Sequence, residues 1–327
     1  MSTVTGPHLP EPAEKRPDMT TTSTARCDIA VVGESLIDIT LNADGNCRER
    51  FSGSPAALAW SLGRLGIATT LLTTFGADPH GRTINHELTR CGVRIVQAGH
   101  RATRTSTVTA HPDRPGAPTV DLCWELVHTD VPSCGHLHVG SIAVVRAPGA
   151  DDVARLVSRQ TPDTTISYDV NVRPSAMGPR HISIARIDEM ISRSDVVKLS
   201  DADLAWLRPG ERHGDAIRWL MSRGPAIVVV THGSAGATGY TRSGSVRVRG
   251  HRVDVAHTAG VGDAFMAGLL HAMSVRSLLA RKAARRLRTI GLDDLHSILR
   301  HANLCAAQAI TPAGIEPPHI DDLAVAS

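Results

Sequence analysis

The chain has 327 residues, of which 42% are hydrophobic and 20% charged, and its formal net charge is +3. This length suits one large α/β domain or two average ones, and the near-neutral charge gives no general reason to expect a nucleic-acid or membrane partner. Aromatic residues make up only 3%, which argues against stacking platforms for single-stranded nucleic acid. No apolar run approaches the ~18 residues of a membrane span. The six cysteines include no CxxC pair, which favours reduced thiols and a cytoplasmic protein.

Residues 1–26 are rich in Thr, Ser and Pro and lack an apolar stretch, so we expect a disordered leader followed by a single domain over residues 27–327. In the domain, short apolar runs alternate with amphipathic stretches. The predicted strands are 28–32, 69–74, 137–139, 165–170, 196–199 and 227–231, and the predicted helices include 55–65, 81–91, 151–159, 215–223 and 263–273. Strands that are apolar on both faces and separated by crossover-length segments predict a mainly parallel sheet covered by helices.

Two stretches interrupt this alternation. Residues 37–42 and 93–126 have period-two or irregular β character with no helix between strands. We expect them to form a small β-sheet that projects from the main domain as a lid. Any homodimer is expected to form through this lid.

The segment from Thr258 to Gly268 carries the strongest chemical signal. Gly260 and Gly262 allow a tight turn, and the residues after Asp263 read as a helix. A glycine turn that leads into a helix points unpaired N–H groups at one spot, where a phosphate binds well. A carboxylate there is placed to accept a proton from an attacking hydroxyl. Asp is also a favoured N-cap, and the spacing alone does not separate the two roles.

The hexapeptide from Gly260 to Phe265 resembles the GAGDxF signature of the ribokinase/fructokinase (PfkB-type) family of carbohydrate kinases. The resemblance implies that Asp263 is the catalytic base and that the backbone amides of Gly260, Val261 and Gly262 form an anion hole. It also implies a ribokinase-like, three-layer α/β/α domain that uses ATP and Mg²⁺.

Six further segments resemble the family in the right order. They are 32–38, 52–66, 75–82, 169–174, 194–203 and 230–236, and a helix from Ala302 resembles the one that flanks adenine. The resemblance implies that Asp38, Gly53, Ser54 and Arg173 bind the sugar, and that Asn171, Lys198, Thr231, Gly233, Gly236 and Asn303 bind ATP. It implies that Asp203 acts on Mg²⁺ through water.

Several of these residues also have plainer roles open to them. Asp38 suits a turn or helix cap as well as a sugar contact. Ser54, followed by Pro, suits an N-cap, and Arg173 suits a surface ion pair as well as a phosphate. The segment from Thr231 onward suits a simple hairpin into Tyr240 as well as a nucleotide-binding turn at the sheet edge.

The sequence departs from the family pattern at three positions. His257 replaces the carboxylate of the monovalent-cation site, which argues against cation activation; Ala57 replaces a sugar-binding Asn; and Asp203 replaces a Glu. By resemblance, Glu34 and the 169–174 segment favour fructose or a ketodeoxygluconate-like acceptor. The alternative to a kinase is a catalytically weak or silent sugar- or nucleotide-binding member of the same fold.

Overall fold

The computed structural model describes residues 27–42, 46–99, 104–111, 117–126, 133–251, 260–279, 283–311 and 314–324. The predicted leader, residues 1–26, lies outside the described residues. None of the helices in the described ranges is long and apolar enough to cross a membrane.

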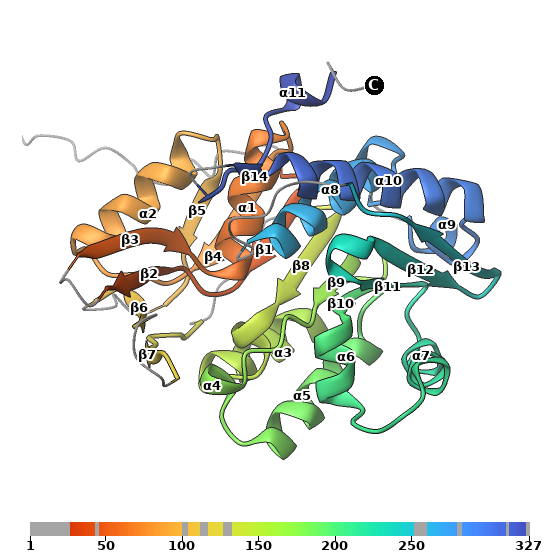
Figure 1. Ribbon diagram of the computed structural model, residues 1–327, viewed down its shortest axis with the longest axis horizontal. Coiled ribbons are helices and arrows are strands. Elements are labelled where there is room, and N and C mark those ends of the chain that lie inside the picture. The colour runs from red at the N-terminus through yellow and green to blue at the C-terminus, as the bar shows by residue number, and fades with distance from the viewer. Residues whose placement is uncertain are drawn as a thin grey trace, which may run out of the picture.

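A nine-stranded sheet forms the centre of the molecule (Figure 1), in the order β13-β12-β11-β10-β9-β8-β1-β4-β5. The seven strands from β11 to β5 in this order are parallel, and β12 and β13 add antiparallel to β11 at one edge. The strands are β1 (Ile29–Val32), β4 (Thr69–Thr73), β5 (Arg94–Gln97), β8 (His136–Gly140), β9 (Thr165–Asp169), β10 (Val196–Ser200), β11 (Ile227–Thr231), β12 (Ala237–Thr241) and β13 (Gly244–Val248).

Helices cover both faces of this sheet, as expected for three α/β/α layers (Figure 1). Along β1, Ile29 and Val31 pack into one buried apolar cluster while Ala30 and Val32 pack into the other, because successive side chains of a strand point to opposite faces. On the first face lie α1 (Ser54–Arg64), α2 (Pro79–Thr89), α8 (Val261–Val275) and α10 (Leu292–Gln308), and on the second lie α3 (Gly149–Ser158), α5 (Arg180–Ser192), α6 (Asp201–Leu207) and α7 (His213–Ser222).

Short elements complete the connections. They are α4 (Pro174–Met177), α9 (Ala284–Arg288), α11 (Ile320–Ala324), the 3₁₀ turns η1 (Ser141–Val144) and η2 (Gly233–Ala235), and the strand pair β14 (Ile310–Thr311) and β15 (Gly314–Ile315).

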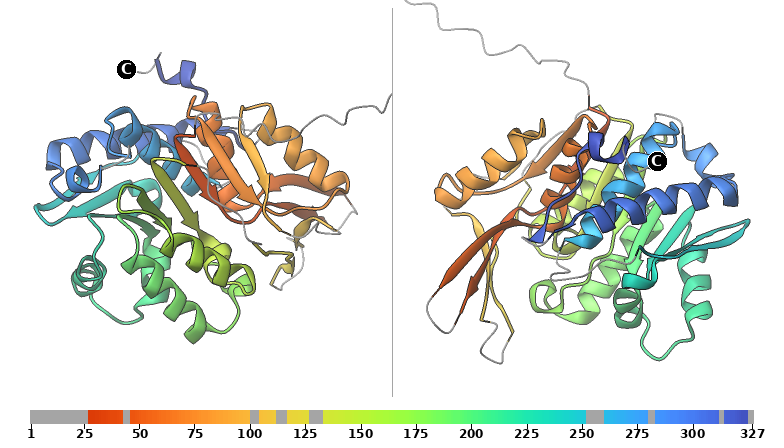
Figure 2. Two further views of the ribbon diagram at one scale, coloured as in Figure 1. Left: turned by 180° about the vertical axis from the view of Figure 1, so that it is seen from behind. Right: turned by 45° about the horizontal axis from the view of Figure 1, so that its top comes forward.

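A second, four-stranded sheet projects to one side of the domain (Figure 2), in the order β3-β2-β6-β7. It consists of β2 (Leu36–Leu41), β3 (Cys47–Ser52), β6 (Ser106–Ala110) and β7 (Thr119–Asp121). The predicted lid range 93–126 starts too early, because β5 pairs with β4 in the main sheet. The sequence analysis also missed β3, which pairs along its whole length with β2.

The parallel strands direct their carboxyl ends toward one edge of the main sheet, where ligands of open α/β sheets bind. The residues that follow β1, β8, β9 and β10, together with the first turn of α8, meet at this edge. The small sheet stands beside it, since β2 and β3 lead from the end of β1 into α1.

Candidate active site

Helix α8 begins with a glycine turn at the edge where the parallel strands end. Gly260 is its N-cap and adopts a left-handed backbone conformation with φ of 94°, which an L side chain rarely tolerates. Asp263 is the third residue of the helix, so Gly260 and not Asp263 occupies the N-cap position. The interpretation of Asp263 as an N-cap is therefore wrong, and its carboxylate is left for other contacts at the end of the helix where unpaired N–H groups point.

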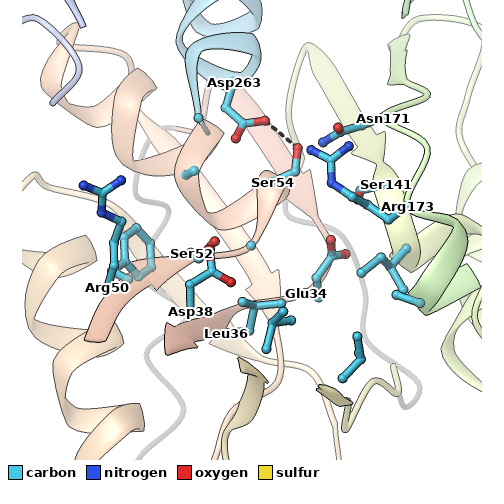
Figure 3. A pocket seen from close by; sticks show the side chains of 18 of the residues that line it. Glu34, Leu36, Asp38, Arg50, Ser52, Ser54, Ser141, Asn171, Arg173 and Asp263 are labelled. Carbon is cyan, nitrogen blue, oxygen red and sulfur yellow. Dashed lines mark hydrogen bonds between the residues drawn. The ribbon is translucent and has the colours of Figure 1, made fainter. Parts of the chain in front are cut away.

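Ser54 reaches Asp263 from the start of α1. Its hydroxyl donates to Oδ1 of Asp263 at 2.5 Å, across 209 residues of sequence (Figure 3). Gly53, not Ser54, is the N-cap of α1, with φ of 99°. A Cβ at Gly53 would lie 2.6 Å from the carbonyl oxygen of Glu34, so only glycine fits this turn. The N-cap interpretation of Ser54 is also wrong.

Burial raises the pKa of Asp263 above the usual value of an aspartate. The hydrogen bond from Ser54 and the positive charges of Lys198 and Arg173 oppose this rise. A carboxylate whose pKa lies closer to neutrality is a stronger acceptor of a proton from a hydroxyl.

A cavity of about 240 Å³ opens beneath Asp263, between the main sheet and the small sheet (Figure 3). All four residues that the sequence assigned to the sugar line it, together with Asp263: Asp38, Gly53, Ser54 and Arg173. The small sheet contributes an apolar wall that includes Leu36, Phe51, Val108 and Val120. The cavity therefore combines hydrogen-bonding groups on one side with apolar cover on the other, as small-ligand sites do.

Asp38 lies within β2 and opposite Arg50 of β3, so it caps neither a helix nor a turn. Burial raises its pKa, while a hydrogen bond from Ser52 and the charges of Arg50 and Arg173 oppose the rise. Its carboxylate lines the cavity and can accept hydrogen bonds from two neighbouring hydroxyls.

Glu34, which the sequence linked to the choice of acceptor but not to a contact in the site, also lines this cavity. It lies two residues after the end of β1, is 2% exposed, and accepts a hydrogen bond from the backbone N–H of Ala143 at 3.1 Å. Burial raises its pKa to about 7, and the hydrogen bonds from Ser141 and Ala143 only partly offset this. A Gly-Glu pair at the end of a fully apolar strand is the sequence signal for such a buried acid.

A second cavity of about 440 Å³ lies on the other side of the α8 terminus. The residues that the sequence assigned to ATP line it: Asn171, Lys198, Thr231, Gly233, Gly236 and Asn303. Val261, Gly262 and Asp203 line it as well. Asn171 and Arg173 line both cavities, so the two cavities meet at these residues beside α8. Asn171 has a φ of 42°, a left-handed conformation that Asn tolerates better than most residues.

For the segment from Thr231 onward the sequence left open a hairpin or a nucleotide-binding turn, and the two interpretations do not exclude each other. β11 and β12 do form a hairpin, with Val228 opposite Tyr240, and the η2 turn between them lines the second cavity. Gly236 has a φ of 98°, and a Cβ there would lie 2.1 Å from the carbonyl oxygen of Val248. The hairpin therefore builds the wall of this cavity.

Asp203 is committed to local structure. Its Oδ1 accepts from the N–H of Val172 at 2.8 Å, and its Oδ2 accepts from the N–H and hydroxyl of Ser200 at 2.8 and 2.7 Å, in a capping box at the start of α6. Within the described residues, no group of three His, Cys, Asp or Glu side chains is arranged to hold a metal ion. Oδ2 accepts two hydrogen bonds and Oδ1 accepts one, so only Oδ1 keeps a lone pair for a water of a hydrated Mg²⁺.

The family assignment follows from a comparison with family models. Residues 27–321 match the model of pfkB family carbohydrate kinases. The chain belongs to the pfkB family. It is an ATP-dependent carbohydrate kinase with the fold that the sequence motifs predicted.

Among curated relatives in the pfkB family, a fructokinase of Rhizobium leguminosarum bv. trifolii is 32% identical over 275 residues, which cover 79% of this chain and 83% of that protein. A fructokinase of Salmonella typhimurium is 28% identical over 301 residues, which cover 87% and 93%.

Solved structures of pfkB-like enzymes agree in fold. Fructokinase of Xylella fastidiosa with bound ATP has a TM-score of 0.78 at 22% identity and covers 91% of this chain and 97% of that one. Fructokinase of Vibrio cholerae O395, bound to fructose, ADP and a calcium ion, has a TM-score of 0.73 at 25% identity and covers 88% and 94%.

His257 and the two residues after it, Thr258 and Ala259, also lie outside the described residues. Ala57 is described and lines the first cavity where the family carries an Asn. Asn303 lines the second cavity and donates to the carbonyl oxygen of Arg249 at 3.3 Å.

Proposed function

We propose that this enzyme transfers the γ-phosphoryl group of ATP to a hydroxyl of a neutral ketose such as fructose. The observation that carries the proposal is the position of Asp263 and Ser54 at the meeting point of a smaller cavity rich in carboxyl groups and a larger one. The sugar binds in the first cavity and the nucleotide in the second, so that the accepting hydroxyl and the γ-phosphoryl group meet beside the first turn of α8.

The charges of the first cavity favour a neutral sugar over a sugar acid. Glu34, Asp38 and Asp263 line it, and of its two guanidinium groups Arg173 is shared with the second cavity. The carboxylate of a ketodeoxygluconate-like acceptor would face the negative charges of Asp38 and Asp263 and gain few cationic partners. Sugar hydroxyls donate readily to carboxylates, so a polyol suits the same lining.

In the proposed mechanism, Asp263 accepts the proton of the attacking hydroxyl. Ser54 holds Oδ1 at 2.5 Å, which fixes the orientation of the carboxylate and leaves its second oxygen for the sugar. General-base assistance of this kind contributes about 10²–10⁴-fold to the rate.

Backbone N–H groups and two cations support the moving phosphoryl group. The amides of Gly260, Val261 and Gly262 belong to the first turn of α8, where helix N–H groups lack intrahelical partners. Arg173 lines both cavities and offers a planar fork of donors to phosphate oxygens. Lys198 lines the nucleotide cavity and supplies a second positive charge.

We also propose that Mg²⁺ accompanies the nucleotide, with Asp203 holding one of its waters. When bound, the cation would screen the negative charges of the phosphates, which would make the γ-phosphorus easier for the hydroxyl to attack. All six cysteines are free thiols, which supports a cytoplasmic enzyme. A homodimer through the four-stranded sheet remains a prediction.

ATP turnover across a panel of acceptors tests the proposal. The panel contains fructose, glucose, ribose and 2-keto-3-deoxygluconate at matched concentration with Mg-ATP. We expect kcat/KM to be highest for fructose and lowest for the sugar acid. Preference for the sugar acid would contradict the charge argument, and the absence of sugar-dependent turnover with every acceptor would favour a silent sugar-binding protein.

A further inference from the structure

A buried ion pair lies under the junction of the two cavities. Lys198 of β10 and Asp169 at the end of β9 are paired in the strand register, and Nζ lies 2.8 Å from Oδ2. The two residues are 5% and 1% exposed. By contrast, the Arg193–Glu189 pair lies at the surface, with its side chains 39% and 51% exposed.

Such a pair is a weak device for stability, because removing both charges from water costs about as much as their attraction returns. The ion pair lies at the carboxyl end of the parallel strands, where sheets of this kind bind their ligands. This position favours a role in the site over a role in stability. Among the described residues, the buried Oδ1 of Asp169 has no hydrogen-bond partner. The carboxylate is thus committed to the lysine through Oδ2 alone.

The lysine ammonium lies beside the catalytic helix. A Cβ built on Gly262 would come within 3.2 Å of Nζ, so the ammonium borders the first turn of α8, one residue from Asp263. Lys198 also lines the nucleotide cavity. An ammonium has three donors, and Asp169 occupies one of them.

Resting on the proposed function, we propose that Asp169 is a positioning residue for phosphoryl transfer. Its carboxylate holds the Lys198 ammonium beside the α8 terminus, where the remaining N–H donors meet the phosphoryl group on its way from nucleotide to sugar. Asp169 itself touches neither ligand. Its role is to fix the direction of the lysine and to keep it charged in a buried site.

The titratable groups around Lys198 come from four elements. Asp169 (β9), Asp263 (α8) and Asp203 (α6) favour its charged form, while burial opposes it, and the sum raises the pKa of Lys198. On β8, burial together with the charges of His136 and Lys198 keeps the pKa of His138 well below its usual value, so that imidazole is neutral. Asp169 makes the largest favourable contribution, so its loss leaves only Asp263 and Asp203 to oppose burial, and the pKa of the lysine should fall.

The test compares Asp169→Asn, Lys198→Arg and the double variant in pH profiles of kcat. Asp169→Asn should move the alkaline limb down by about one pH unit or more, because an opposite charge at this distance shifts a pKa by that amount. The double variant should show no such limb, because a guanidinium stays charged. KM for the sugar should stay within about two-fold, since neither residue lines the sugar cavity.

Asp195→Asn is the matched control. Asp195 sits at the amino end of the same strand pair and accepts from the N–H of Ile166 at 2.9 Å. Its neutralisation should lower the melting temperature and leave the alkaline limb in place. An Asp169→Asn enzyme that behaves like Asp195→Asn would overturn the inference.

A measurement on the wild type covers the case in which Asp169→Asn does not fold. The ¹³Cε resonance of Lys198, assigned by its loss in Lys198→Arg, should shift when ADP is added. An unchanged resonance with saturating ADP would overturn the inference. Absence of sugar-dependent turnover in the wild type would instead contradict the proposed function, and the resonance would still report whether the lysine meets the nucleotide.

Discussion

The buried acid Glu34 allows a stability prediction with a definite magnitude. Its pKa rises from 4.5 to about 7 because the carboxyl is removed from water. Between these pH values the folded protein keeps the proton while the unfolded chain releases it. The free energy of unfolding therefore falls as the pH rises through this window and is constant above it. At 1.36 kcal/mol per pKa unit, the total loss is about 3 kcal/mol.

The substitution Glu34→Gln tests this, because glutamine has the same shape and stays neutral. Its amide oxygen can still accept from the N–H of Ala143. We expect the free energy of unfolding of the variant, relative to wild type, to rise by about 3 kcal/mol between pH 4.5 and pH 8. Urea titrations of both proteins without ligands, at half-unit steps of pH, measure the difference directly.

Glu189→Gln serves as the control, since Glu189 is 51% exposed and its ion pair with Arg193 lies at the surface. Its curve should run parallel to that of the wild type. If the Glu34→Gln and wild-type curves were also parallel from pH 4.5 to 8, the carboxyl would not be protonated in the folded protein near neutrality, and the reasoning from burial would fail.

Three further predictions concern the site. Ser54→Ala removes the hydrogen bond that lowers the pKa of Asp263, so the acid limb of kcat/KM should move to higher pH and kcat should fall about ten-fold. An acid limb at the same pH in the variant would show that Ser54 does not act on the base. Gly53→Ala should lower the free energy of unfolding by more than the ~1 kcal/mol expected for Gly66→Ala. Both glycines have a positive φ, but only at Gly53 would a Cβ lie 2.6 Å from a backbone carbonyl oxygen. Equal losses for the two variants in urea titrations would show that the turn at Gly53 relaxes. Turnover in potassium and in tetramethylammonium salts at equal ionic strength should differ by less than about two-fold, because the imidazole of His257 lacks the negative charge of the family carboxylate. A strong potassium requirement would show that other groups hold the cation.

The six neighbouring strands from β11 to β4 of the main sheet could be predicted from the sequence because they are apolar on both faces, whereas β5, β12 and β13 were not among the predicted strands. Residues 227–231, for example, were expected and found as β11. The small sheet was harder. β3 carries Arg48, Glu49 and Arg50 on a largely exposed strand, so no apolar pattern marks it, and only its pairing with β2 makes it a strand.

The residues of the two cavities could be predicted from motifs, but their local roles could not. Asp203 closes a capping box through contacts with Val172 and Ser200, and Val172 is 31 residues away in the sequence. The pairing of Asp169 with Lys198 depends on the register of β9 and β10. A sequence read segment by segment shows neither which carboxylates become buried nor which partners satisfy them.

The central claim is that Asp263 is the base for the accepting hydroxyl. The most direct test measures fructose-dependent ATP turnover and nucleotide affinity for the wild type and for Asp263→Asn, which keeps the shape of the side chain and removes its ability to take the proton. The account predicts that kcat falls by about 10²–10⁴-fold while the Kd for ATP changes by no more than a few-fold. Turnover close to that of the wild type in Asp263→Asn would contradict it.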